Sequence, residues 1–168
     1  TVSSGTLVGG ATNAFVASSA YTVASDAILS VNFNQVIGSL AGAGTVTNGG
    51  TATRTLTTGG NNSSTTFSGV IQNGASALAL TKSGTGTLTL APSLPSANTY
   101  TGGTLVNVGT LAGGALNAFS AGSAHTLAAG TTLDLGGFNQ AIASLAGTSG
   151  TVTNAGSAAA TLATGGAA

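Results

Sequence analysis

The run LALTKSGTGTLTL, residues 78–90, decides the fold class of this 168-residue chain. Leu alternates with Ala or Thr before the tetrapeptide SGTG, and Leu alternates with Thr after it. Alternation with a period of two residues is the pattern of a strand that buries one face. Glycine reaches the positive φ angles of tight turns without steric cost, so SGTG predicts a sharp corner. The run therefore predicts two short strands joined by a corner.

The same pattern continues in both directions along the chain. Further strands are expected at residues 21–23, 28–31, 45–47, 53–57 and 105–108, separated by clusters of Gly, Asn and Ser. No apolar stripe with a period of 3.6 residues persists for ten residues, so helices are not expected. Short strands at this spacing are compatible with a sandwich, a barrel or a solenoid.

An internal repeat distinguishes between these folds. Residues 5–60 and 109–166 are two copies of one unit, with about 35 identities in roughly 56 aligned positions and an offset that drifts from about 104 to about 106 residues. Equivalent residues of a solenoid stack coil over coil, as such repeats require. We therefore predict an all-β, right-handed parallel β-helix with coils of roughly 20 to 24 residues. Its expected units are a first copy at 1–60, a different segment at 61–104 and a second, partial copy at 105–168, in one continuous solenoid.

Five short motifs stand in order within and around the middle segment. They are FSGVI at 67–71, LTKSG at 80–84, GTLTL at 86–90, NTYTGGT at 98–104 and VGTL at 108–111. In this order they resemble the autotransporter-associated β-strand repeat, also called the passenger-associated transport repeat, of bacterial type V secreted proteins. The sequence departs from that pattern at Pro92–Ser96 and at Ala75–Ala77. Both departures fall at expected turns, so they affect loop shape and leave the strands unchanged.

The repeated large apolar residues give the expected interior, and the glycines between the strands give the expected corners. The predicted core residues are Leu7, Phe15, Phe33, Phe67, Ile71, Leu88, Leu90, Leu111, Phe119, Leu133 and Phe138. The predicted turn glycines are Gly10, Gly50, Gly60, Gly103, Gly114 and Gly166.

The composition excludes several classes of function. Only Asp26, Arg54, Lys82 and Asp134 carry formal charge, which is 2% of the chain against roughly 25% in an ordinary soluble domain. One Arg and one Lys cannot form a basic face for nucleic acid. The chain has no cysteine for a disulfide or a cysteine metal site, and no apolar run long enough for a membrane-spanning helix.

Catalytic groups are equally few. Asp26 and Asp134 are the only carboxylates, and neither has a counterpart in the other copy of the repeat. His125 is the only histidine; it takes the place of Tyr21, and we expect it at the surface or rim. No G-x-S-x-G motif occurs, and a single Asp at 134 cannot supply the six or more oxygens of a calcium site. We expect no enzyme activity, no cofactor and no metal.

The resemblance implies a passenger that is exported through an outer-membrane β-barrel and folds outside the cell as an elongated stalk. Absence of cysteine suits such export, and the expected location is extracellular, at the bacterial cell surface. The chain begins with Thr1 and shows no signal peptide, so we expect both ends to be cuts through a longer polypeptide. The expected partners are neighbouring repeats of the same chain, with no nucleic acid and no membrane insertion by this segment.

Two alternatives remain open. With almost no charge to oppose association, the array could assemble end to end or laterally into an extracellular filament or matrix. The polar Thr, Ser and Asn face could instead bind a carbohydrate or a host surface, as an adhesin module. A secreted hydrolase is the weakest alternative, because titratable groups are scarce.

Overall fold

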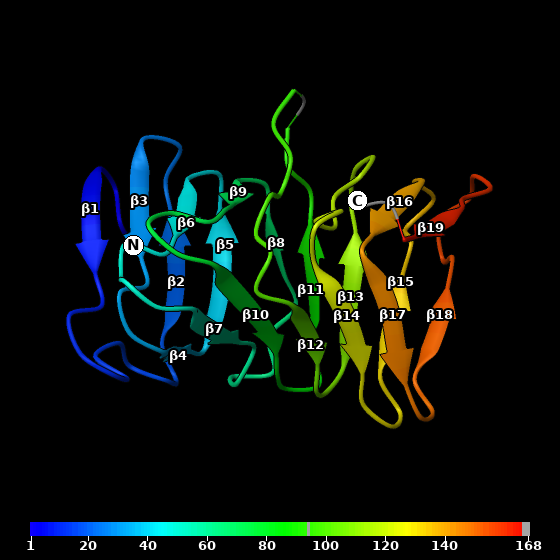
Figure 1. The fold of residues 1–168 in the computed structure, drawn as a ribbon, viewed down its shortest axis with the longest axis horizontal. Coiled ribbons are helices and arrows are strands. Elements are labelled where there is room, and N and C mark those ends of the chain that lie inside the picture. The colour runs from blue at the N-terminus through cyan, green and yellow to red at the C-terminus, as the bar shows by residue number, and fades with distance from the viewer. Residues whose placement is uncertain (94, 166–168) are drawn as a thin grey trace.

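The structure is a computed structural model that describes residues 1–93 and 95–165. All regular elements in this part of the chain are β-strands, and every strand pair is parallel. The strands form a β-solenoid of about 7 turns with about 22 residues per turn. Figure 1 shows them side by side along the long axis, from β1 at one end to β18 at the other. The fold class expected from the alternation and the repeat is confirmed.

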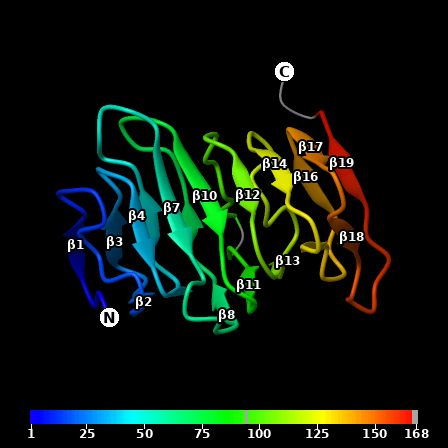
Figure 2. The same cartoon turned by 90° about the horizontal axis from the view of Figure 1, so that it is seen from below.

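The coils have three faces. Face A contains β2 (Ala20–Val23), β5 (Ser39–Gly42), β8 (Thr65–Phe67), β11 (Thr87–Leu90), β13 (Thr110–Gly113), β15 (Thr132–Asp134) and β18 (Thr151–Thr153). Face B contains β1 (Gly5–Val8), β3 (Ala27–Ser30), β6 (Thr45–Thr47) and β9 (Val70–Ile71), and towards the other end β16 (Gln140–Ile142) and β19 (Leu162–Thr164). Face C, seen side by side in Figure 2, contains β4 (Gln35–Ile37), β7 (Arg54–Thr58), β10 (Leu78–Lys82), β12 (Thr104–Val106), β14 (Ala124–Leu127) and β17 (Ser144–Gly147).

Two irregular segments join the parts of face B. Residue Thr99 donates its backbone N–H to the Ile71 carbonyl, and the Ser120 hydroxyl donates to the Tyr100 carbonyl. The Phe119 N–H donates in turn to the Gln140 side chain, one coil further on. Residues 98–100 and 118–120 therefore continue face B between β9 and β16.

The interior is a continuous column of apolar side chains. Leu88 of β11 lies in register with Leu111 of β13, which lies in register with Leu133 of β15, and all three are buried. Burial of such side chains contributes roughly 25 cal/mol per Å² of apolar surface removed from water. Eight of the predicted core residues are buried: Phe15, Phe67, Ile71, Leu88, Leu90, Leu111, Phe119 and Leu133.

Three predicted core residues lie at the surface instead. Phe33 and Phe138 are 39% and 41% exposed, because each lies at a bend of the chain before a face B or face C strand, where strand alternation does not apply. The Arg54 guanidinium lies over the Phe33 ring, 5.0 Å from its centroid, in a cation–π contact. Leu7 is 36% exposed because its strand, β1, pairs with β3 on one side only.

The predicted turn glycines lie between strands, but few of them lie where the backbone conformation requires glycine. Gly10, Gly50, Gly60, Gly103 and Gly114 are all outside the strands, and Gly166 is outside the described residues. Of these five, only Gly103 has a positive φ. The tightest corners are elsewhere: a Cβ built on Gly84, whose φ is +69°, would meet the Gly59 carbonyl oxygen at 1.8 Å.

The two copies of the long repeat are turned relative to each other by one face. Tyr21 belongs to β2 on face A, whereas its equivalent His125 belongs to β14 on face C. Likewise β3 is on face B and its equivalent β15 is on face A. At about 22 residues per turn, an offset of about 104 residues corresponds to about four and two-thirds turns. Equivalent strands therefore do not lie on the same face.

Candidate functional site

The two carboxylates are not brought together. Asp26 is exposed in the turn between β2 and β3, near the N-terminal end of the solenoid. Asp134 lies in β15, several coils away, and its Oδ1 accepts hydrogen bonds from the backbone N–H groups of Gly136 at 2.9 Å and Ala155 at 2.8 Å. These bonds fix the turn after β15. A paired acid and base cannot be built from two carboxylates in these positions.

The expectation that His125 lies at the surface is wrong. Its side chain is fully buried, because it continues the inward column that runs through Leu80, Thr104 and Leu145 on face C. Nδ1 lies 3.0 Å from the Ser123 carbonyl, and the ring lies 5.6 Å from the Phe119 ring, centroid to centroid. Burial lowers the pKa of His125 to about 4, so the imidazole is neutral at pH 7.

A chain of buried hydroxyl groups lies beside this histidine. The Tyr100 hydroxyl bonds the Thr104 hydroxyl at 2.7 Å, and Thr104 Oγ1 bonds Ser123 Oγ at 2.9 Å. Burial raises the pKa of Tyr100 to about 12. The Ser123 hydroxyl is thus engaged by Thr104, while His125 meets only the Ser123 carbonyl. This arrangement satisfies polar groups inside the core and does not form a serine–histidine nucleophile pair.

Lys82 is a buried group that the sequence analysis did not identify. Its side chain is 1% exposed, and its amine donates to the carbonyls of Ser83 at 2.6 Å, Gly84 at 2.8 Å and Val108 at 3.3 Å. Burial lowers the pKa of Lys82 from 10.5 to about 8. The amine fastens the corner after β10 to the next coil. The signal was the alternation itself, since Lys82 shares the inward parity of Leu78 and Leu80.

A buried glutamine performs the same task in both copies of the long repeat, and the sequence analysis missed it too. Gln35 Oε1 accepts from the Phe15 N–H at 3.0 Å, and its amide nitrogen donates to the Ala11 carbonyl. In the second copy, Gln140 binds the Phe119 N–H at 3.2 Å and the Ala115 carbonyl at 2.8 Å. Each side chain therefore joins two neighbouring coils where no strand ladder connects them.

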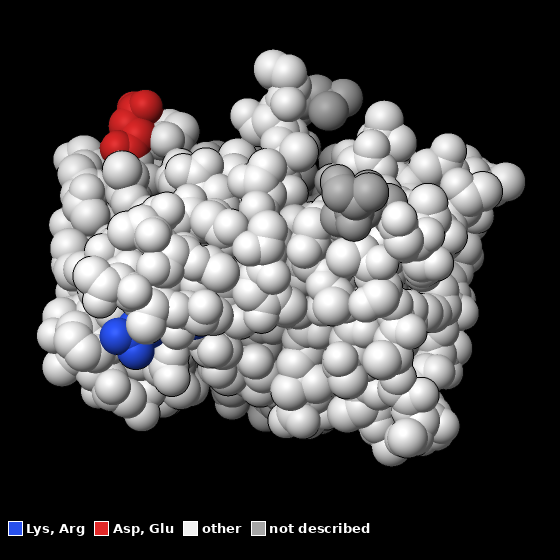
Figure 3. Space-filling model, viewed as in Figure 1, with Lys and Arg blue, Asp and Glu red and all other residues white. Residues whose placement is uncertain are grey.

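The outer surface is polar and almost uncharged. Figure 3 shows one small acidic and one small basic area on an otherwise neutral face. On face A, outward threonines stack in register over four successive coils: Thr87, Thr110, Thr132 and Thr151. Such a surface offers hydroxyl and methyl groups and little charge.

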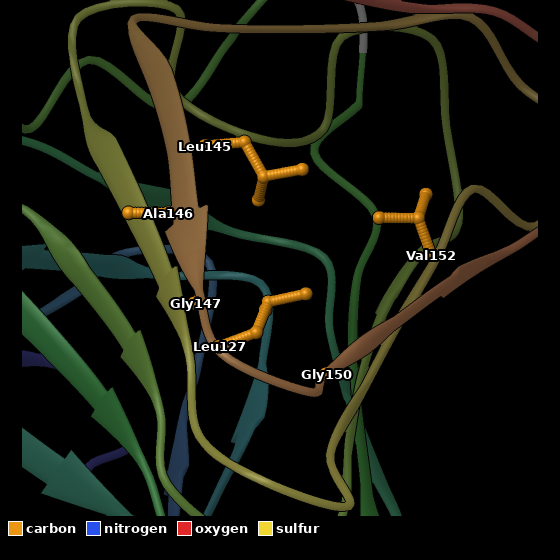
Figure 4. A pocket seen from close by; sticks show the side chains of 6 residues that line it. All are labelled: Leu127, Leu145, Ala146, Gly147, Gly150 and Val152. Carbon is orange, nitrogen blue, oxygen red and sulfur yellow. The ribbon is translucent and has the colours of Figure 1, made fainter.

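The C-terminal end of the solenoid has a pocket of about 210 Å³ whose lining combines apolar side chains with exposed backbone of glycines. Figure 4 shows the side chains of Leu127, Leu145 and Val152 directed towards it, with Gly147 and Gly150 at its margin. Leu145 and Val152 are 38% and 39% exposed, although each points along the inward column of its face.

Within residues 1–93 and 95–165, no group of three or more His, Cys, Asp or Glu side chains is placed to hold a metal ion. The same part of the chain contains no helix of the length and hydropathy that crossing a membrane would need.

Comparison with known proteins gives one finding. Residues 80–112 match the family model described as Passenger-associated-transport-repeat, which covers about a fifth of the chain. Neither the curated proteins nor the solved structures gave a match. The matched residues run from β10 through β11 and β12 to β13, so they include the Lys82 corner and one complete coil. The chain therefore carries a passenger-associated transport repeat within a β-solenoid, and both features fit a stalk segment of an autotransporter passenger.

Proposed function

We propose that this chain is a structural stalk segment of a secreted bacterial surface protein of the autotransporter passenger type. The observation that carries the proposal is the passenger-associated transport repeat at 80–112, located in a parallel β-solenoid of about 7 turns. At about 4.8 Å per coil, such a solenoid is a rod segment about 35 Å long. Its task is to hold another part of the polypeptide away from the outer membrane.

The role is non-catalytic. The separation of Asp26 from Asp134 and the burial of a neutral His125 support this, because proton transfer requires titratable groups that meet each other and the substrate. The buried Lys82 amine is occupied by three carbonyls within the stalk.

Surface display tests the proposal. The chain is inserted between an N-terminal epitope and the outer-membrane β-barrel of an autotransporter, and the distance of the epitope from the membrane is measured by cryo-electron tomography. We expect the epitope to move outward by about 35 Å relative to a fusion without the insert. The Leu111→Asp variant, which places a charge in the core, is expected to lose this displacement. An epitope that reaches the surface without moving outward would contradict the stalk role.

A second candidate is an extracellular filament formed end to end. The exposed apolar residues Leu7 and Val8 at one end and Leu145 and Val152 at the other favour it. Since only four residues carry charge, we expect association to depend little on salt. Negative-stain microscopy at low and high ionic strength would then show thin fibres of similar width. Single short particles at both ionic strengths would exclude the filament.

A further inference from the structure

The pocket at the C-terminal end has an occupied counterpart inside the same molecule. Its lining residues Leu127, Leu145, Gly147, Gly150 and Val152 are equivalent, in the repeat, to Val23, Leu40, Gly42, Gly44 and Val46. In the first copy Leu40 and Val46 are fully buried, whereas Leu145 and Val152 are more than a third exposed. The same set of residues is thus seen once covered and once open.

The segment that covers the first copy is FSGVI, residues 67–71. Phe67 is the register partner of Gly42 and is fully buried in the core. The Ser68 N–H donates to the Gly42 carbonyl at 2.8 Å, and the Val70 N–H donates to the Gly44 carbonyl at 3.0 Å. The covering strands are therefore held by backbone hydrogen bonds and by an aromatic anchor, as in strand addition at a sheet edge.

Gly69 restricts what this covering segment can be. A Cβ on Gly69 would meet the Gly44 carbonyl oxygen at 1.9 Å and Phe67 Cζ at 2.7 Å. The residue two positions after the phenylalanine must therefore be glycine. Gly150 takes the place of Gly44 in the open pocket, after a loop that is one residue longer, and we expect the same requirement there.

We propose that the pocket formed by Leu127, Leu145, Gly147, Gly150 and Val152 is a docking site for a Phe-x-Gly strand of another short repeat of the 61–104 type, continuing the same array. The phenylalanine fills the pocket, and the N–H groups of the next residues bond the carbonyls of Gly147 and Gly150. This inference rests on the proposed stalk, since it specifies the next coil of that stalk.

The test extends the chain by a second copy of residues 61–104 placed directly after Gly166, the position equivalent to Gly60. Hydrogen–deuterium exchange of residues 144–153 is compared with that of the unextended chain. We expect exchange at least about tenfold slower in the extended chain, because the open strand edge becomes paired. Exchange in β10 and β11, deep in the solenoid, reports that the body of the protein is folded in both.

Two matched controls address specificity. Within the appended copy alone, the equivalent of Phe67→Asp or of Gly69→Val should return exchange of residues 144–153 to that of the unextended chain. An appended copy of residues 5–48, from the long repeat, should also fail to protect them. Unchanged exchange in the extended chain, or equal protection by the long-repeat segment, would overturn the proposal. Neither result alters the epitope displacement that tests the stalk itself.

Discussion

Because His125 is buried, we expect the stability of the fold to depend on pH. Its imidazole is held neutral by burial, with a pKa of about 4 against an ordinary value of 6.5. Between these two pH values the unfolded chain binds a proton that the folded chain does not bind. The free energy of unfolding therefore falls as pH decreases from about 6.5 to about 4, and it is insensitive to this group above pH 6.5.

We predict a loss of about 2–3 kcal/mol between pH 7 and pH 4.5 from His125, the only histidine of the chain. The His125→Leu variant, which continues the leucine column, should lose little stability between pH 7 and pH 4.5. Urea unfolding of the original chain and of the variant at these two pH values measures the two losses. If the variant and the original chain lose the same stability, another group is responsible.

The buried glutamines give a second prediction at the residue scale. The Gln35→Leu substitution leaves the buried Phe15 N–H without a partner, whereas the exposed Ala11 carbonyl still accepts from the Ala14 N–H. An unsatisfied buried polar group costs about 1–3 kcal/mol, so we expect a loss of that size in the free energy of unfolding. Gln140→Leu should behave alike, since its bonds are equivalent. The exposed Gln72→Leu is the control, and a similar loss there would contradict the assignment.

At the corners between strands, the close approach of neighbouring coils limits which residue types fit. Gly84 combines a φ of +69° with a carbonyl oxygen of the preceding coil at the place where a Cβ would stand. Gly10 has neither constraint, because no heavy atom lies within 4 Å of its Cβ position and its φ is not positive. Comparing the two glycines therefore distinguishes a glycine that is merely common in turns from one that the close approach of neighbouring coils requires.

We predict that Gly84→Ala destabilises the solenoid by at least about 2 kcal/mol, through backbone strain and the clash with Gly59. Gly10→Ala should change stability by no more than about 0.5 kcal/mol. Thermal and urea unfolding of both variants provide the comparison. Equal losses of stability at the two positions would mean that contact with the preceding coil does not require glycine at position 84.

The alternation in the sequence predicts strands well and corners poorly. The strand expected at 45–47 is found there, and that expected at 28–31 is found at Ala27–Ser30. Phe33 and Phe138 were assigned to the core on hydrophobicity alone, but they lie at bends where residue parity is lost. His125 is expected at the surface because its side chain is polar, and Lys82 is not identified as an interior group, although parity along β14 and β10 places both side chains inward. Within strands, the position of a residue in the alternation thus predicts burial better than the polarity of its side chain does.

At the scale of the whole molecule, the long repeat advances by about four and two-thirds turns. Each successive copy is consequently turned by one face, and three successive copies would present a given strand on all three faces. The outer surface of β2 therefore lies on face A, and that of its equivalent β14 lies on face C.

Disulfide cross-linking tests this rotation. The chain has no cysteine of its own, so introduced cysteines can pair only with each other. Thr126 is the register partner of Leu105 on face C, and both side chains are exposed. Register partners on parallel strands lie within the Cα separation that a disulfide permits, roughly 4.4–6.8 Å. We predict that Leu105→Cys with Thr126→Cys forms an intramolecular disulfide under mild oxidation on face C. Thr126→Cys with Ala146→Cys on face C, and the equivalent pair of the first copy, Thr22→Cys with Ala41→Cys on face A, should oxidise as well. Ala112→Cys with Thr126→Cys is the control: Ala112 belongs to β13 on face A and Thr126 to β14 on face C, so this pair should not oxidise. Mobility on non-reducing gels and mass spectrometry of tryptic fragments distinguish the two pairings.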